Sequence, residues 1–358
     1  MAYQMTSHER FKRMFEHREA DRVPIIDGPW GSTIQRWIQE GMPADADFRQ
    51  YFGLDFISCV IPDCSPREQY KVIEDTPEHT ISSDRWGCVS KRLKAPGAEM
   101  PLFMEYPLKT SADWPAMKAK MTYADDRVPF EHLAQNYKKW KEAGHWTQAI
   151  VEVGFNIISA AWTGIETFLV ALVEEPEWCI DMVNHNVDLN IQFLDAMWDR
   201  GYEFDSVMWY DDMGYKGSAF FSVDKYREFL KPAHKKLADW IHSKGVAAHL
   251  HSCGNVMELV PDLVEIGVDA LNPLEIKAGM DPMKLKGAYG DRLLLHGGIN
   301  AMLWPDFEAI EAEIKAMLPS LMQGGGYIFS SDHSVPCDVS LENFRKITEL
   351  AKKLGSYS

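Results

Sequence analysis

The sequence lacks the motifs that bind nucleotides. It contains no phosphate-binding G-x-x-x-x-G-K-[ST] loop and no G-x-G-x-x-G segment after an apolar run. The glycine run Gly324-Gly325-Gly326 is typical of a turn that ends a helix. Nucleotide-dependent chemistry is therefore not supported.

Basic charge is scarce relative to acidic charge. The 37 Lys and Arg residues against 53 Asp and Glu residues give a formal net charge of −16. Because nucleic-acid binders usually carry a basic stripe, we expect no nucleic-acid partner. Long apolar runs are absent as well: none approaches the roughly 20 residues of a membrane span, so we expect no membrane partner.

Cysteine is also sparse. The chain has six cysteines in 358 residues, and their spacing shows no disulfide framework. This usage indicates a reducing compartment in which thiols serve as core residues or metal ligands. The polar segment 1–6 leads into a charged amphipathic helix and does not resemble a signal peptide. We expect a cytoplasmic protein, with the oligomeric state left open and a homodimer as one option.

What the chain does have is a regular alternation of short apolar runs and helical patterns. Apolar residues lie largely on one helical face over 177–200 and 224–242, and further helices are expected over 256–266 and 306–322. Alternation of this kind predicts an α/β fold, a single (β/α)8 TIM barrel over residues 1–358. The eight expected strands are 23–27, 55–62, 148–153, 206–212, 246–253, 270–275, 293–299 and 327–333.

One interval breaks this rhythm. Residues 63–146, between the second and third expected strands, form a long insertion. Loops of this length in compact domains tend to be lids or binding excursions. We therefore expect 63–146 to be an elaborated segment near the mouth of the barrel.

The segment with the strongest chemical signal follows the fifth expected strand. His251 and Cys253 are two residues apart, so on a strand their side chains project to the same side. A second imidazole and thiolate, His333 and Cys337, follow the eighth expected strand. Three or four nitrogen and sulfur ligands of this kind are typical of zinc. Cys337 could equally be a small hydrophobic residue.

Further polar and aromatic residues gather at the expected strand ends, where the active sites of barrel enzymes lie. The polar set is Asp27, Asp63, Glu152, Asp211, Asp212, His249, His251, Cys253, Asn272, Glu275, His296, Asp332, His333 and Cys337. The aromatic set is Trp30, Trp86, Trp162, Trp209 and Tyr210. The aromatic residues predict a flat apolar substrate, although core packing is the alternative for several of them.

Several segments, in chain order, resemble the uroporphyrinogen decarboxylase superfamily. They are Asp21-Arg22-Val23-Pro24, the run 222–232, His251-Ser252-Cys253-Gly254-Asn255, the run 266–273, Gly297-Gly298-Ile299-Asn300 and the run 325–343. The resemblance covers nearly the whole chain. It implies one of two activities: decarboxylation of a tetrapyrrole without a cofactor, or zinc-dependent methyl transfer to or from a corrinoid carried by a partner protein.

The family's motifs favour the second activity. The decarboxylases carry an arginine-rich R-Q-A-G-R segment that holds substrate carboxylates, whereas the corresponding run 27–33 has no arginine before Arg36. His251-Ser252-Cys253 resembles the H-x-C motif of the methyltransferases. By this resemblance the distal metal ligand is either His333 or Cys337.

The resulting hypothesis is a methyltransferase that demethylates a methoxylated, aromatic small molecule and passes the methyl group to a corrinoid-binding protein. Zinc, or a proton from Glu152, Asp212 or Glu275, would neutralise the charge that develops on the ether oxygen. One alternative is methyl transfer to a thiol of the coenzyme M type. Another is a cofactor-free decarboxylase that uses Asp27, Asp63 or Asp211. The identity of the methyl donor and the direction of transfer are left open.

Overall fold

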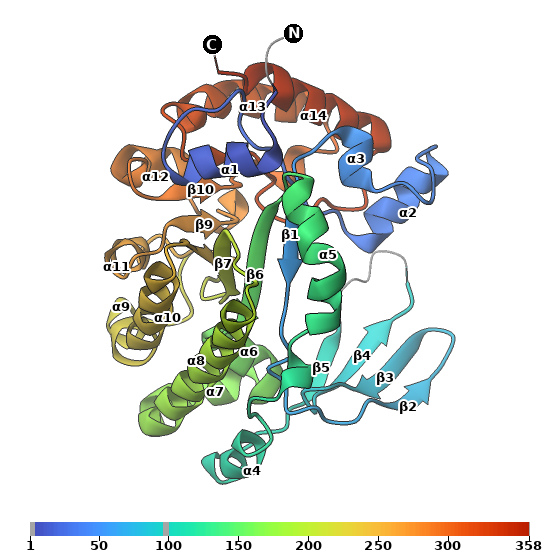
Figure 1. Ribbon diagram of the computed structural model, residues 1–358. Helices are drawn as coiled ribbons and strands as arrows, with labels where there is room; N and C mark the ends of the chain where they lie inside the picture. Colours follow the sequence, from blue (N-terminus) through green and yellow to red (C-terminus); the bar gives the residue numbers. More distant parts are fainter. Residues whose placement is uncertain (1–3, 96–99, 358) are drawn as a thin grey trace.

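A curled sheet of seven parallel strands forms the centre of the computed structural model, which describes residues 4–95 and 100–357 (Figure 1). The strands are β1 (Ile57–Val60), β6 (Trp146–Glu152), β7 (Ser206–Tyr210), β8 (Ala247–His251), β9 (Ala270–Asn272), β10 (Leu294–His296) and β11 (Tyr327–Ile328). They lie side by side in this order, and each pairs in parallel with the next.

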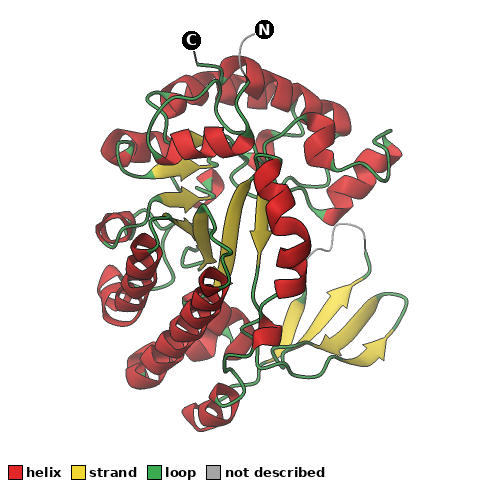
Figure 2. Cartoon of the chain, viewed as in Figure 1, coloured by secondary structure: helices red, strands yellow, loops and turns green. Residues whose placement is uncertain are grey.

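Helices surround this sheet (Figure 2). They are α1 (Ser7–Phe15), α2 (Gly31–Gln39), α3 (Phe48–Phe52), α4 (Trp114–Lys118), α5 (Phe130–Glu142), α6 (Phe155–Ile157), α7 (Ile165–Glu174), α8 (Pro176–Asp199), α9 (Val223–Lys225), α10 (Lys231–Ser243), α11 (Val260–Glu265), α12 (Pro282–Tyr289), α13 (Phe307–Met322) and α14 (Leu341–Leu354). Short 3-10 turns cover Ser111–Asp113, Asp125–Arg127, Ile276–Ala278 and Ala301–Leu303, and π-helical turns cover Ile158–Trp162 and Tyr226–Leu230.

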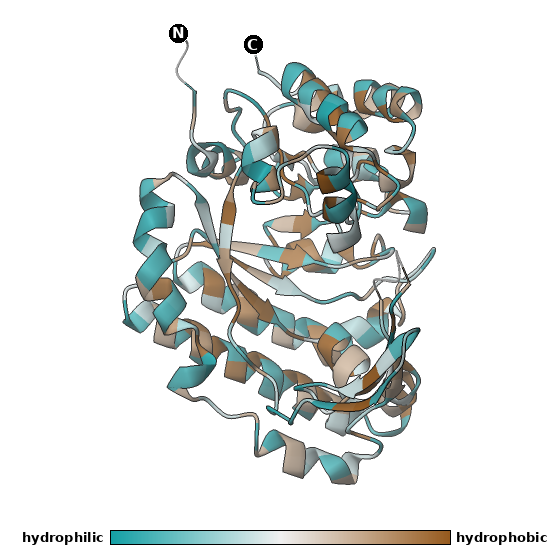
Figure 3. Cartoon of the chain, turned by 90° about the vertical axis from the view of Figure 1, so that its right-hand side faces the viewer, coloured by the Kyte–Doolittle hydropathy of each residue, from teal (hydrophilic) through white to brown (hydrophobic). Residues whose placement is uncertain are grey.

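The strands form where the sequence is apolar because helices cover the parallel sheet and remove it from solvent. In β6 all residues but the last are buried, and β9 and β10 are buried throughout. Figure 3 shows hydrophobic residues on the central strands, whereas the outer helices carry hydrophilic faces.

The helices expected over 177–200 and 306–322 correspond closely to α8 and α13. The helix expected over 224–242 is instead divided into α9, a π-helical turn and α10. Pro232 lies in the first turn of α10, and its missing N–H explains why regular α-helical hydrogen bonding starts anew there.

Seven of the eight expected strands overlap the observed ones, whereas residues 23–27 do not form a strand. This segment makes a single parallel bridge between Ile25 and Phe329. Pro24 has no N–H to donate, so regular pairing is interrupted there. The segment still lies between the two edges of the sheet: Phe329 N donates to Pro24 O, and Asp55 N donates to Ile25 O, each at 2.9 Å. It thus occupies the eighth position without strand geometry.

A buried carboxylate fixes this closing segment. Asp55 accepts hydrogen bonds from the Arg10 and Arg22 guanidinium groups at 2.9 and 2.6 Å and from Ile25 N at 2.8 Å. Asp55 is only 1% exposed. A buried carboxylate needs such partners, since an unpaired one is costly to desolvate. The first helix, the closing segment and the entry to β1 are therefore held together.

The interval 63–146 contains a second, separate sheet that the sequence patterns did not reveal. Its four antiparallel strands, in this order, are β2 (Lys71–Asp75), β3 (His79–Ser83), β4 (Val89–Leu93) and β5 (Leu102–Glu105). The end of the interval instead holds α5, which leads directly into β6 (Figure 1).

Among the described residues, no single helix is both long and apolar enough to cross a membrane. One helix pair, Phe155–Trp162 with Ile165–Glu174, passes that test only jointly, and it is bent by 120°.

Candidate active site

A cavity of about 590 Å³ opens at the carboxyl ends of the parallel strands. Its walls come from the closing segment, from β6 to β10 and from the loops after β8 and β11. Polar and sulfur-containing side chains on these walls include Asp27, Gln148, Tyr210, His251, Cys253, Asn272, His296, Ser331 and His333. Because active sites of parallel α/β folds lie at this end of the strands, this cavity is the candidate active site.

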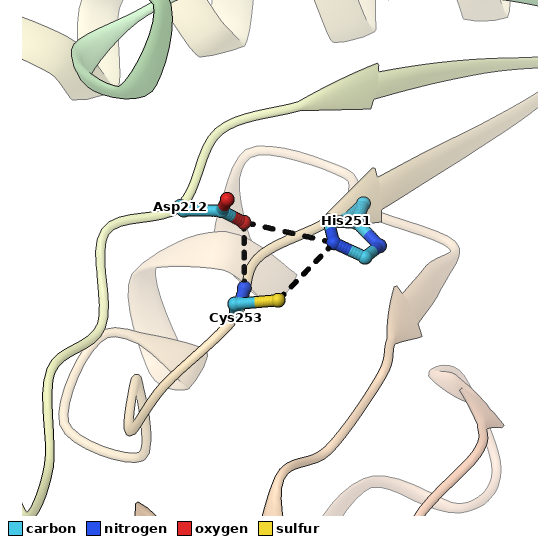
Figure 4. Close-up of side chains that lie close together, drawn as sticks. All are labelled: Asp212, His251 and Cys253. Atoms are coloured by element: carbon cyan, nitrogen blue, oxygen red, sulfur yellow. Dashed lines mark hydrogen bonds and ion pairs between the residues drawn. The ribbon is translucent and has the colours of Figure 1, made fainter. Parts of the chain in front are cut away.

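His251 and Cys253 meet in the wall of this cavity, as the strand alternation predicts. His251 ends β8 and Cys253 follows it, with 3.4 Å between Nε2 and Sγ. Asp212, just after β7, approaches both: its Oδ1 lies 3.6 Å from His251 Nε2 and accepts a 2.8 Å hydrogen bond from Cys253 N (Figure 4). Imidazole, thiol and carboxylate atoms within 4.8 Å of one another can hold one metal ion.

A second group shares the same thiol. Cys253, Glu275 and His333 also have ligand atoms within 4.8 Å of one another, and His333 Nε2 lies 3.8 Å from Glu275 Oε1. Asp332 fixes the loops beside this group, because its carboxylate accepts from Ile276 N and Ala301 N at 3.0 and 2.8 Å. The two groups together surround Cys253 with two imidazoles and two carboxylates.

Asn272 sets the tautomer of His251. The Asn272 side-chain amide donates from Nδ2 to His296 O at 3.2 Å, which leaves its Oδ1 to accept from His251 Nδ1 at 2.5 Å. His251 therefore carries its hydrogen on Nδ1, and the Nε2 lone pair faces Cys253. In metal sites the ring nitrogen of a histidine that does not bind the metal usually donates such a hydrogen bond, which fixes the tautomer and the orientation of the ring.

Electrostatics at this site favour a cation. Burial, together with Asp212 and Glu275, raises the pKa of the Cys253 thiol. Burial lowers the pKa of His251, although Asp212 opposes this effect. Without a cation the thiol is protonated and the imidazole neutral. A divalent metal would reverse the balance at the thiol, since a coordinating thiol loses its proton.

Two of the five predicted aromatic residues line the cavity. The Tyr210 ring lies 4.4 Å from the His251 ring, and the Trp30 ring lies 6.0 Å from that of His333. The other three, Trp86, Trp162 and Trp209, are buried in the hydrophobic core, so for them the packing alternative holds. Tryptophans are large enough to fill a core, and their spacing alone does not separate the two roles.

Two further site candidates, Glu152 and Cys337, are neither among the described residues that line the cavity nor members of a candidate metal group. Glu152 ends β6, but its carboxylate lies 3.5 Å from Arg85 in the 63–146 interval. Cys337 is exposed, its carbonyl accepts a hydrogen bond from Arg36, and it belongs to neither candidate metal group within the described part of the chain. His333, four residues earlier, is the distal residue that the structure brings to Cys253.

Gln148, Ser331 and Met100 are among the wall residues that the sequence-based hypothesis did not name. Gln148 lines the cavity together with Ile150, two positions along β6, so strand alternation could have identified it. Ser331 donates from Oγ to Asp27 Oδ1 at 2.6 Å. Met100 reaches the cavity from the 63–146 interval, and no local pattern indicates this contact.

Asp27 has an unusual proton affinity. Burial raises the pKa of this carboxyl group to about 6, although three hydrogen bonds from Ser331 and Gly28 oppose the effect. The cavity therefore contains a carboxyl group that releases its proton near neutral pH.

Comparison with known proteins agrees with the resemblance seen in the sequence. Residues 95–354 match the family model described as "Uroporphyrinogen decarboxylase (URO-D)", and the chain belongs to this family. Curated relatives include uroporphyrinogen decarboxylases of Staphylococcus epidermidis (28% identical over 49% of this chain and 47% of that protein) and Bacillus subtilis (27% identical over 37% and 38%). The chain spans about half the length, or less, of the curated relatives it matches.

Among solved structures, a "methyltransferase from Methanosarcina mazei" has a similar fold. The TM-score is 0.65 at 17% identity, over 98% of this chain and 99% of that chain. At this identity the likeness shows the fold alone.

Proposed function

We propose that this protein moves a methyl group from a methoxylated, aromatic small molecule to the cobalt of a corrinoid carried by a separate protein, with the assistance of zinc. The observation that carries the proposal is the donor set around Cys253, in which His251 presents a lone pair and His333 lies within reach. The methyltransferase with a similar fold adds support from outside the chain.

The residues present fit zinc. His251, Cys253 and His333 would hold the ion through nitrogen and sulfur, with Asp212 or Glu275 as an oxygen ligand. When bound, zinc would supply a Lewis acid beside the leaving oxygen of the substrate.

The chain's own residues would bind and orient the substrate. Tyr210 and Trp30 flank the donor set and offer flat faces to an aromatic ring. In the reaction the O–CH3 bond breaks and its electron pair stays on oxygen, while the electron pair of Co(I) forms the new bond to carbon. The released phenolate then takes a proton. Asp27 is an acid in the cavity with a pKa suited to this step, whereas Glu152 is not among the described residues that line the cavity.

The whole chain would act as one (β/α)8-type domain, with 63–146 as an elaborated segment beside the mouth. Met100 on the cavity wall and the Arg85–Glu152 ion pair at the end of β6 support this arrangement.

Decarboxylation is the second candidate, because the curated relatives carry that name. The cavity does not favour it: none of the described residues that line it is Lys or Arg, and a polycarboxylate needs cationic partners. Of the three acids considered for this chemistry, Asp27 alone lines the cavity. Asp211 is paired with His234 at 2.9 Å in the core, and Asp63 is bound by Ser65 and Arg67.

The test is an anaerobic incubation of the zinc-loaded protein with Co(I) corrinoid and a panel of methoxyarenes, followed by absorbance. We expect loss of the Co(I) spectrum, formation of methyl-Co(III) and release of a phenol. No change across the panel would contradict the proposal. Methyl transfer from methylcobalamin to a thiol would instead support the coenzyme M-type alternative, and release of CO2 from uroporphyrinogen would support the decarboxylase.

A further inference from the structure

A chain of hydrogen bonds runs through the interior of the curled sheet and ends at the cavity. Trp146 Nε1 and Gln148 Nε2 each lie 2.9 Å from Ser206 Oγ. Gln148 Nε2 also lies 3.2 Å from His249 Nδ1, and His249 Nε2 lies 3.3 Å from His296 Nδ1. Ser206, Gln148, His249 and His296 are all buried, and they come from β7, β6, β8 and β10.

The direction of each hydrogen bond in this series follows from the placement of the Gln148 side-chain amide, whose Nε2 faces His249 Nδ1. An indole N–H and an amide NH2 can only donate. Gln148 therefore donates to His249 Nδ1, and the hydrogen of this imidazole is on Nε2. His249 in turn donates to His296 Nδ1, so the hydrogen of His296 is on Nε2.

The last donor of this hydrogen-bonded series, His296 Nε2, has no partner among the residues that the structure describes. No hydrogen bond from His296 Nε2 is found within residues 4–95 and 100–357, and the atom is not sealed in the core. His296 lines the cavity that holds His251 and Cys253. A fixed N–H donor on an otherwise buried ring is costly to leave unpaired, so it selects for a ligand that offers an acceptor.

We propose that His296 binds the methyl donor by donating from Nε2 to a substrate oxygen, and that this selects ethers and phenols over thioethers and hydrocarbons. Gln148 and His249 are positioning residues, because they act only through the tautomer of His296. That this ligand is the methyl donor rests on the proposed function. Ether and phenol oxygens are better hydrogen-bond acceptors than a thioether sulfur, which accepts only weakly, and a hydrocarbon offers no acceptor.

The test compares two ligands of matched shape, methoxybenzene and ethylbenzene, by calorimetric titration without corrinoid. The wild-type protein should bind methoxybenzene about fivefold more tightly, as one neutral hydrogen bond provides. His296→Phe should bring the two affinities to parity. His296→Gln, which keeps an N–H donor, should retain part of the preference. As a control, Ile150→Val on the cavity wall should change both affinities by the same factor.

The tautomer has its own readout. In a protein labelled with 15N-histidine, two-bond 1H–15N correlations should show His296 protonated on Nε2. Gln148→Met removes the amide donor, so it should alter this pattern and reduce the oxygen preference, measured as the ratio of the two affinities because Gln148 itself lines the cavity. A hydrogen on Nδ1 in the wild type, or an undiminished preference in His296→Phe, would overturn the inference. Methyl transfer that fails while the oxygen preference persists would overturn the proposed function instead.

Discussion

The two sheets of this protein have opposite relations to solvent. In β7 of the parallel sheet every residue but Tyr210 is buried, whereas all five residues of β2 in the antiparallel sheet are exposed. Crossover helices cover a parallel sheet, while an antiparallel sheet joined by hairpins brings no helices of its own. Stability and the candidate active site therefore depend on the parallel sheet.

The antiparallel sheet nevertheless carries apolar side chains on its surface. Val72, Ile73 and Leu102 are 54%, 60% and 66% exposed. The comparison predicts that the same substitution changes stability more in the parallel sheet than in the antiparallel sheet.

The largest effect is expected at the rim of the parallel sheet. Cys253→Ser removes the thiol shared by both candidate metal groups, so zinc affinity should fall by at least about 100-fold, with methyl transfer lost. The measurement is metal analysis after dialysis, with a chelator competition for affinity. Cys337→Ser is the matched control and should retain about one zinc per chain. Full zinc content in Cys253→Ser, or none in the wild type, would refute the site.

The second effect concerns packing. Leu295 in β10 is fully buried, so Leu295→Ala should lower the free energy of unfolding by about 2–5 kcal/mol. Leu102→Ala in β5 is the same change at an exposed position and should stay within about 0.5 kcal/mol. Urea unfolding followed by circular dichroism measures both. Equal losses would show that the antiparallel sheet contributes as much as the parallel one.

The third effect is a pH dependence of opposite sign in the two regions. The pKa of Asp27 is raised to about 6, so the native state binds more protons than the unfolded state between about pH 4 and 6. Protonation of Asp27 therefore stabilises the native state at low pH, and this stabilisation is lost as the pH rises through about 6. Asp27→Asn should therefore gain stability relative to the wild type from pH 4 to 7, by about 3 kcal/mol at most.

Asp75 in β2 is the counterpart. Lys94 lowers the pKa of Asp75, so its stabilising contribution is present above the ordinary pKa and is lost on acidification. Asp75→Asn should lose a little stability at pH 7 and none at low pH. Thermal unfolding across this range measures both variants, and parallel pH curves for Asp27→Asn and Asp75→Asn would contradict the argument.

The smallest effect on stability is expected at Ile73. Ile73→Lys places a charge on the exposed sheet, so the unfolding free energy should change by no more than about 0.5 kcal/mol, while self-association at high concentration decreases. Static light scattering and urea unfolding test the two parts. A substantial loss of stability would show that Ile73 is covered in solution.

The sequence predicted the parallel sheet better than the antiparallel one because burial on both faces demands continuous apolar runs. Strand β2 reads Lys-Val-Ile-Glu-Asp, which shows neither such a run nor a regular alternation, so nothing local marked it as a strand. Residues 23–27 resembled a strand in composition, but Pro24 prevents regular pairing.

Within the candidate site, residues close in sequence were predictable and residues joined by register were not. His251 and Cys253 follow from the period of two along β8. The contact between His251 and Asn272 depends on the pairing of β8 with β9, which periodicity does not give. The choice of His333 over Cys337 for proximity to Cys253 depends on the path of a loop.

The closing segment around Ile25 constrains the order of events during synthesis. Its partner Phe329 is made about 300 residues later, so at ~5–20 residues per second the ribosome needs about 15–60 s between the two. Throughout that time Pro24 and Ile26 lack the backbone partner that Phe329 provides in the finished fold. Contacts this distant in sequence slow folding. A nascent chain stalled before β11 should therefore be a good substrate for chaperones, and one released after β11 a poor one.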